Sequence, residues 1–353
     1  MKALIVGLGA IGQRHVRNLR LLLGNGVEFL ACRVRHLSQT ITPELTVDPN
    51  RDVEHTLGVR AFNNAEEALE QKPTMALICN PTSLHLPVAL LAANAGCHIF
   101  VEKPLSASLA GVDDLARELD RRQLVGLVGY QMRFHPCLRR VRELLAAAAV
   151  GAIIAVHAHV GEDIREWHKY EDYRQSYAAR SDLGGGTILT QIHEIDYLFW
   201  FFGMPRRLFS VGGHLSRLEL DVEDTANILM EYHILGKHVP VHIHQNYLQR
   251  PAKRTLEIIG DAGTISVDLM TPSLSLVDAQ GRIVEATVYN GFERNHLFIE
   301  EMRHFLNCMQ GQESPLVSLR DGARSLEIAL ASKASLISGR VVELTDGNLQ
   351  LGA

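Results

Sequence analysis

Gly7-Leu8-Gly9-Ala10-Ile11-Gly12 is a G-x-G-x-x-G sequence that begins directly after the short apolar run of residues 2–6. Apolar side chains then recur at helical spacing from residue 10 to residue 23. A strand, a glycine turn and a helix in this order predict a dinucleotide-binding unit. We expect Gly7 to permit the tight turn, Gly9 to let the backbone approach a pyrophosphate, and Gly12 to let the helix pack on the strand.

The start of the helix after this turn is the expected phosphate contact. The N–H groups of Ala10 and Ile11 have no partner within the helix and carry a partial positive charge. A plain glycine turn is the alternative interpretation, but the preceding strand and following helix favour a cofactor site.

Strand and helix patterns alternate through the first third of the chain, which predicts a parallel sheet with right-handed crossovers. Residues 38–58 mix prolines with scattered charge and predict a loop or irregular insertion. Further strands are expected at residues 27–32, 74–79, 98–101 and 124–128, and helices at residues 84–95 and 109–122.

The end of the second expected strand bears on the choice of cofactor. A carboxylate there would bind the ribose 2′-hydroxyl of NAD. Here Arg33 and Arg35 occupy this end, and no acid follows the strand directly. Guanidinium groups pair well with a 2′-phosphate, so the sequence favours NADP over NAD, with a solvated strand end as the alternative.

Phe100-Val101-Glu102-Lys103-Pro104-Leu105, an apolar strand that ends in Glu-Lys-Pro, is the second informative stretch. Ligands of open α/β sheets bind beyond the carboxyl ends of the strands. We therefore expect Glu102 and Lys103 at the cofactor. Asn80, Pro81 and His85 follow the strand at residues 74–79 and are expected nearby, although an ordinary Asn-Pro turn has the same pattern.

Five stretches in a fixed order make the chain resemble the glucose–fructose oxidoreductase/inositol dehydrogenase (Gfo/Idh/MocA) family over nearly its whole length. They are Gly7 to Gly12, Asn80-Pro81-Thr82-Ser83-Leu84-His85, Ala95 to Pro104, Gly129-Tyr130-Gln131-Met132-Arg133-Phe134-His135-Pro136, and Gly184-Gly185-Gly186 followed by His193-Glu194-Ile195-Asp196.

This resemblance implies a Rossmann domain and a C-terminal α/β domain with a large open, mostly antiparallel sheet. One face of that sheet would form the interface of a homodimer or homotetramer. The resemblance also implies hydride transfer between NAD(P) and a hydroxyl-bearing carbon of a sugar or sugar derivative. Lys103 would then lie by the nicotinamide and the substrate hydroxyl, with the Lys103–Pro104 peptide in the cis form.

The chain departs from the family pattern around His193. Many members carry aspartate four residues before this histidine and glycine two before it, where this chain has Leu189 and Gln191. The second acid of the polyol dehydrogenases is therefore missing, which argues against inositol dehydrogenase chemistry. Residues 190–197 are more similar to members of nucleotide-sugar and sialic-acid-like sugar pathways.

Oxidation of an alcohol needs a hydride acceptor, which the cofactor supplies, and a proton acceptor. His193 suits the second role because its ordinary pKa lies near neutrality, while Lys103 would hold the reacting oxygen. Alternatively, Lys103 is itself the acid and base, with a pKa lowered by burial. Asp196, three residues after His193, is expected to orient a neighbour.

The change from helix–strand alternation to strand-rich sequence predicts domains at residues 1–129 and 130–353, with the C-terminal strand or helix packed back on the first domain. Strands are expected at residues 153–160, 207–214, 225–232, 239–247 and 255–267, and helices at residues 187–202, 292–310 and 320–338. The expected substrate contacts are Tyr130, Gln131, Arg133, Trp167, Tyr173, Arg174 and Gln191.

Composition excludes several classes of protein. The 353 residues carry a net charge of -5, so no basic footprint indicates nucleic acid. No apolar stretch approaches the roughly 20 residues that span a bilayer. The five cysteines form no C-x-x-C and suit a reducing compartment, which predicts a cytoplasmic protein.

Two competing functions remain open at this point. One is a catalytically silent cofactor-binding protein that senses a ligand or regulates a partner. The other is a metal-dependent lyase or hydrolase, since His157 with His159, and His242 with His244, each share a sheet face. We expect no metal, because the resemblance needs none and a half-buried sheet explains the pairs.

Overall fold

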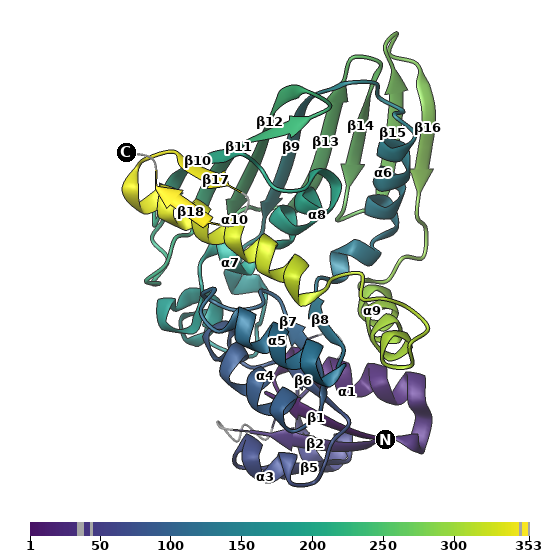
Figure 1. Cartoon of the computed structure of the whole chain (residues 1–353), viewed down its shortest axis with the longest axis vertical. Coiled ribbons are helices and arrows are strands. Elements are labelled where there is room, and N and C mark those ends of the chain that lie inside the picture. The colour runs from purple at the N-terminus through teal and green to yellow at the C-terminus, as the bar shows by residue number, and fades with distance from the viewer. Residues whose placement is uncertain (34–38, 43–44, 346–347, 352–353) are drawn as a thin grey trace.

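In the computed structural model of the chain, residues 1–33, 39–42, 45–345 and 348–351 are described. The chain forms two lobes, each built on its own sheet, with the N-terminal lobe below the large sheet in Figure 1. One is a parallel six-stranded sheet and the other a mostly antiparallel ten-stranded sheet, which confirms the predicted fold class.

The first sheet has the strand order β5-β2-β1-β6-β7-β8. Its central strands are buried on both faces, which is why they appear in the sequence as apolar runs. The strands are β1 (Lys2–Val6), β2 (Glu28–Cys32), β5 (Val59–Phe62), β6 (Met75–Ile78), β7 (His98–Glu102) and β8 (Gly126–Gly129). Among them, β5 was not predicted.

Helices cover both faces of this sheet, as the alternation predicted (Figure 1). One apolar cluster joins the sheet to α1 (Ala10–Leu23), α2 (Val53–Leu57) and α9 (Arg294–Met309). A second cluster joins the other face to α3 (Ala65–Leu69), α4 (His85–Asn94) and α5 (Val112–Arg122).

The prediction of a loop or irregular insertion at residues 38–58 was wrong for much of the segment. Its described part contains β3 (Gln39–Ile41), paired with β4 (Val47–Asp52), and then α2. Asp52 caps α2 by accepting a hydrogen bond from His55 N, and Gly58 ends it with φ +54. The strands and the helix are too short for a hydrophobic period to show.

The second sheet has the order β16-β15-β14-β13-β9-β12-β11-β10-β17-β18, and only β12 and β9 run parallel among the strands described. The predicted strand at 255–267 is a hairpin that turns at Asp261-Ala262, and β15 to β18 were not predicted. The strands are β9 (Ile153–Gly161), β10 (Arg207–Gly213), β11 (Thr225–Ile234), β12 (Lys237–Asn246), β13 (Lys253–Gly260), β14 (Gly263–Asp268), β15 (Ser273–Asp278), β16 (Ile283–Val288), β17 (Val342–Thr345) and β18 (Asn348–Leu351).

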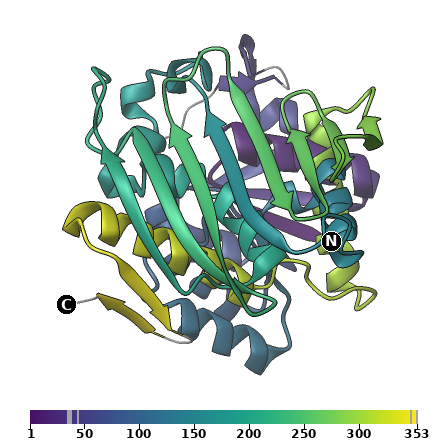
Figure 2. The same cartoon turned by 90° about the horizontal axis from the view of Figure 1, so that it is seen from above.

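One face of the large sheet packs on α6 (Pro136–Ala146), α8 (His193–Phe202) and α10 (Leu319–Ser338), as Figures 1 and 2 show. No described helix covers the opposite, open face. The predicted helix at 187–202 is interrupted between α7 (Thr187–Thr190) and α8. The Gln245 side chain donates to Gln191 O at 2.6 Å, so this carbonyl is bound by a side chain in place of a backbone N–H of the helix.

The C-terminal segment returns to the first lobe. Val128 N donates to Val317 O at 3.1 Å, and the amide side chains of Asn18 and Asn295 bond α1 to α9. Short 3₁₀ turns complete the chain: η1 (Gly24–Gly26), η2 (Thr82–Leu84), η3 (Gln131–Phe134), η4 (Ile164–Glu166), η5 (Tyr173–Gln175), η6 (Tyr177–Ala179) and η7 (Ser181–Leu183). None of the described helices has the length and apolar character to cross a membrane.

Candidate active site

The glycine turn between β1 and α1 has the geometry that a dinucleotide needs. Gly7 has φ +93, and a Cβ there would lie 2.8 Å from the backbone of Cys79 and Asn80. A Cβ at Gly12 would lie 2.1 Å from Gly7 O. At Gly9, by contrast, a Cβ would meet nothing within 4 Å. The first and third glycines are thus required by the protein itself, and the space over the second is open for a ligand.

The start of α1 supports the same conclusion. Gly9 is its N-cap and supplies no side chain to cap it, and no acidic residue occupies the first turn. The N–H groups at Ala10 and Ile11 therefore remain available to an anion. These features fit the pyrophosphate of a nicotinamide dinucleotide.

Arg33 lies at the end of β2, as the sequence indicated, but it is already engaged. Its guanidinium forms an ion pair with Glu54 of α2, and its side chain is buried. A 2′-phosphate would have to share Arg33 with this carboxylate. Arg35 lies outside the described residues.

Lys103 follows β7 at the junction of the two lobes, and its peptide bond to Pro104 is cis. Its Nζ donates to Thr190 O at 2.6 Å. Burial lowers the pKa of Lys103 to about 8, with neighbouring Glu102 opposing the shift. Arg254 and Arg294 lower it further because they place positive charge nearby. This is the pKa that an amine needs to exchange protons near neutral pH.

Two buried histidines hold the segments around Lys103 in place. His15 of α1 lies with Nε2 2.6 Å from Glu102 Oε1. The ring of His85 bridges two turns, with Nδ1 2.9 Å from Pro104 O and Nε2 2.8 Å from Asn80 O. A neutral imidazole can donate only one of these bonds. Glu102 and His85 therefore have scaffolding contacts. The buried Oδ1 of Asn80 has no hydrogen-bond partner among the residues that the structure describes.

His193 opens α8 and lies three residues after the carbonyl that Lys103 binds. Its Nε2 is 3.2 Å from Gln131 Nε2, and the Tyr130 ring meets it edge-on at 5.9 Å between centroids. Its Nδ1 is buried without a partner in the described structure. Burial, followed by the charge of Lys103, moves the pKa of His193 well below its ordinary value, so the ring is neutral at neutral pH.

Asp196 and Arg133 form a buried ion pair away from solvent. Arg133 Nη2 and Nε donate to the two carboxylate oxygens at 2.8 and 2.9 Å, and Arg133 Nη1 donates to Leu316 O at 3.0 Å. The Ser325 hydroxyl also donates to Asp196. The expectation that Arg133 faces the crevice was wrong, because all three guanidinium nitrogens are used internally. Asp196 orients Arg133, not His193.

Gln191 replaces the expected glycine and lies within this core. Its Nε2 donates to Asn246 O at 3.1 Å, while Oε1 has no partner among the described residues. Leu189 is buried, so the aspartate position of the family pattern is filled by an apolar side chain. Tyr130 is also buried, and burial moves its pKa well above the ordinary value.

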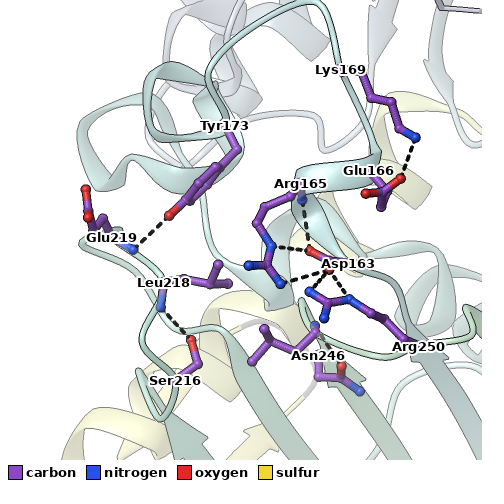
Figure 3. A network of polar contacts seen from close by, with 11 residues as sticks. Asp163, Arg165, Glu166, Lys169, Tyr173, Ser216, Leu218, Glu219, Asn246 and Arg250 are labelled. Carbon is purple, nitrogen blue, oxygen red and sulfur yellow. Dashed lines mark hydrogen bonds and ion pairs between the residues drawn. The ribbon is translucent and has the colours of Figure 1, made fainter.

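The aromatic segment after β9 divides into two parts. Trp167 contacts the ring of Tyr247 edge-on at 5.3 Å, and Tyr247 bonds to the Thr190 hydroxyl, so Trp167 lies toward the site. Tyr173 instead accepts from Glu219 N at 3.1 Å, as Figure 3 shows. Arg174 is exposed and paired with Asp172 and Glu219. Tyr173 and Arg174 therefore join the segment after β9 to the loop that contains Glu219.

Three arginines near the site were not identified from the sequence. Arg254 on β13 makes a bidentate ion pair with buried Glu194, at 2.7 and 3.0 Å, and thereby fixes the first turn of α8. Arg14 on α1 and Arg294 on α9 also place charge near Lys103 or its neighbour Glu102. Their positions depend on strand order and helix packing, and no motif marks them. Within the described residues, no group of three or more His, Cys, Asp or Glu is arranged to hold a metal.

Comparison with known proteins identifies both lobes. Residues 1–130 match the family model of the oxidoreductase family with an NAD-binding Rossmann fold, and residues 138–266 match the GFO/IDH/MocA C-terminal domain. The chain is 26% identical to a myo-inositol 2-dehydrogenase of Thermotoga maritima, with 98% of this chain and 99% of that protein covered.

Solved structures share the fold at lower identity. The WlbA dehydrogenase from Bordetella pertussis, in complex with NADH and UDP-GlcNAcA, superposes with a TM-score of 0.76 at 22% identity, covering 98% of this chain and 99% of that one. UDP-N-acetylglucosamine 3-dehydrogenase GnnA from Acidithiobacillus ferrooxidans superposes with a TM-score of 0.75 at 21% identity, covering 96% and 98%.

Proposed function

We propose that this chain, which belongs to the GFO/IDH/MocA family of NAD(P)-dependent dehydrogenases acting on CH–OH groups, oxidises or reduces a sugar or nucleotide-activated sugar. One observation carries the proposal. Lys103 of the Rossmann lobe extends to the Thr190 carbonyl of the second lobe, three residues before His193, beside a glycine turn with space for a pyrophosphate. The substrate class is supported by relatives named for inositol and nucleotide sugars.

When bound, NAD(P) supplies hydride transfer. The residues that would hold it are Gly7, Gly9 and Gly12 with the amides at the start of α1. Lys103 follows the carboxyl end of β7, the edge at which open parallel sheets bind ligands, and would contact the substrate hydroxyl there.

We assign the proton exchange to Lys103. Its pKa of about 8 leaves a fraction of the amine neutral near pH 7, and that fraction accepts the hydroxyl proton during oxidation. His193 is a weaker base, because forming an imidazolium beside Lys103 and Arg254 is unfavourable. The neutral ring instead holds the reacting oxygen through its unpaired Nδ1, with Gln131 fixing Nε2.

A pH profile tests this assignment. The oxidation rate of the wild type should rise as pH increases through about 8, since Lys103 must lose its proton. In His193→Asn the rate should fall while the same inflection remains; in Lys103→Met the inflection should vanish. Loss of the inflection in His193→Asn with its retention in Lys103→Met would assign the base to the histidine.

For the cofactor we retain the preference for NADP as a proposal, supported by Arg33 at the end of β2. The Arg33–Glu54 ion pair reduces the charge available to a 2′-phosphate. Fluorescence titration of NADH and NADPH into wild type, Arg33→Ala and Glu54→Gln decides the question. Arg33→Ala should weaken NADPH more than NADH, and Glu54→Gln should strengthen NADPH; equal effects on both cofactors would contradict the preference.

The decisive experiment for the function is nicotinamide absorbance with both cofactors against free, acidic and nucleotide-linked sugars. Turnover by the wild type, and its loss in Lys103→Met with cofactor affinity kept, supports the enzyme. Tight cofactor binding without turnover on any sugar would instead support a catalytically silent sensor, for which the named relatives offer no support.

We further propose a homodimer or homotetramer that associates through the open face of the large sheet. That face carries exposed Val211, Leu229 and Val288 beside the paired rings of His159 and His244, 4.8 Å apart. Light scattering after size exclusion should give a mass of two or four chains, and Leu229→Glu should lower it.

A further inference from the structure

Two guanidinium groups, Arg14 and Arg294, lie on the same side of α9 near the site. Arg14 reaches from α1 and stacks over the ring of Phe298, with its Cζ 4.6 Å from the ring centroid. Arg294 is four residues before Phe298 and therefore shares its helix face. Hydrogen bonds between the side-chain amides of Asn18 and Asn295 hold α1 against the start of α9. The two cations therefore lie on helices whose relative position is fixed.

Both cations lie close to the reacting residues. Phe298 meets the His15 ring at 6.2 Å between centroids, and His15 contacts Glu102, which precedes Lys103. Burial lowers the pKa of Arg14 to about 10, and among the charges around it Arg294 contributes most to this shift. Arg294 is exposed to solvent, so an incoming anion can reach it.

These charges lack internal compensation. Neither Arg14 nor Arg294 makes an ion pair or hydrogen bond with any residue that the structure describes. The charged groups that face them are Lys103, Arg17 and Arg254 on the positive side and Glu102 and Glu162 on the negative side. Glu194 pairs with Arg254, and Arg14, Arg294 and Lys103 then outnumber Glu102 and Glu162, so positive charge is in excess.

Unpaired guanidinium groups that lie near each other repel, and an anion between them would remove this cost. We propose that Arg14 and Arg294 bind an anionic group of the substrate, a carboxylate or a phosphate, and so select acidic or nucleotide-linked sugars over neutral ones. This inference rests on the proposed function and specifies its substrate class. The cofactor pyrophosphate has the same chemistry, so the test must separate the two sources.

The test compares Arg294→Ala and Arg14→Ala with wild type, and with Arg303→Ala as the matched control. Arg303 is an exposed cation on the same helix that pairs with Glu300. Turnover is measured with glucose against glucuronate, and N-acetylglucosamine against UDP-N-acetylglucosamine, while NADH and NADPH affinities are measured by fluorescence. Binding of glucuronate and UDP to the NADH-loaded protein is measured by calorimetry.

We expect wild type to prefer the charged member of at least one pair. Arg294→Ala should lower kcat/KM for that member by about 10- to 100-fold, as loss of a charged hydrogen bond does, with neutral sugars and cofactor affinity little changed. Arg294→Lys should recover part of the loss, and Arg303→Ala should behave as wild type.

Three results would overturn the inference: equal losses for charged and neutral sugars, a matching loss of cofactor affinity that assigns the arginines to the pyrophosphate, or no preference for either charged probe in turnover and calorimetry. Turnover of neutral sugars alone would refute the inference and leave the proposed function intact. Anion binding without turnover of any sugar would refute the function instead.

Discussion

Asp196 provides a direct test of whether an acid next to the site acts in chemistry or in architecture. Its carboxylate is fully buried and accepts two bonds from Arg133 and one from Ser325. Asp196→Ala leaves the Arg133 guanidinium buried without a counter-ion among the described residues, with the Leu316 carbonyl as its remaining hydrogen-bond acceptor there. Breaking one side of a buried ion pair costs about 3–5 kcal/mol, so we expect a loss of unfolding free energy of that size.

Urea unfolding, followed by circular dichroism, measures this cost for wild type, Asp196→Ala, Asp196→Asn and Arg133→Met. The double variant Arg133→Met/Asp196→Leu should recover much of the loss, because no unpaired charge remains buried. Asp182→Asn is the control, since Asp182 also pairs with an arginine but is exposed; surface pairs contribute at most about 1 kcal/mol.

Activity decides between the two roles. If Asp196 positions Arg133 and the start of α8, the double variant should regain turnover together with stability. The opposite result is that Asp196→Asn keeps wild-type stability but loses turnover, and that the double variant does not restore turnover. That result would refute the reasoning and make Asp196 a catalytic acid.

Other consequences of the structure can be checked separately. Gly9→Ala should keep the thermal midpoint but weaken NADH binding, because its Cβ meets no protein atom, whereas Gly12→Ala should lower the midpoint through a contact of 2.1 Å with backbone. Burial raises the pKa of Glu301 well above its ordinary 4.5, so the folded state binds the extra proton and stability falls as pH rises past that value. Glu301→Gln should therefore gain stability on wild type from pH 5 to pH 8 in urea unfolding; a constant difference would contradict it. Burial lowers the pKa of His242 and His244, so the proposed oligomer should persist at pH 7 and dissociate at acidic pH as these rings become charged, which sedimentation velocity would show.

Local pattern was sufficient for the glycine turn and the central strands of the first lobe, and for the position of Lys103 at the end of β7. The glycine spacing, the alternation of strands and helices, and the Glu-Lys-Pro ending of β7 each occupy a few consecutive residues, and the geometry they require is local. Sequence reasoning failed where elements are short or exposed, as in β5, α2 and the four strands after β14, because a period cannot be seen over a few residues.

Tertiary structure alone decided the partners of the site residues. Three contacts join residues that are far apart in the sequence: Gln131 and His193 are separated by 62 positions, Arg133 and Asp196 by 63, and Lys103 and Thr190 by 87. Such pairs depend on strand order and on how α8 and α9 pack, which no spacing rule encodes. The same packing turned Arg133 from an expected substrate contact into a buried structural cation, and brought Arg14 of α1 over Phe298 of α9. The sequence by itself thus determined the cofactor fold and the position of Lys103 at the end of a strand, because these rest on local backbone geometry. Only the packing of the two lobes decided which charged side chains are paired inside the protein and which are not.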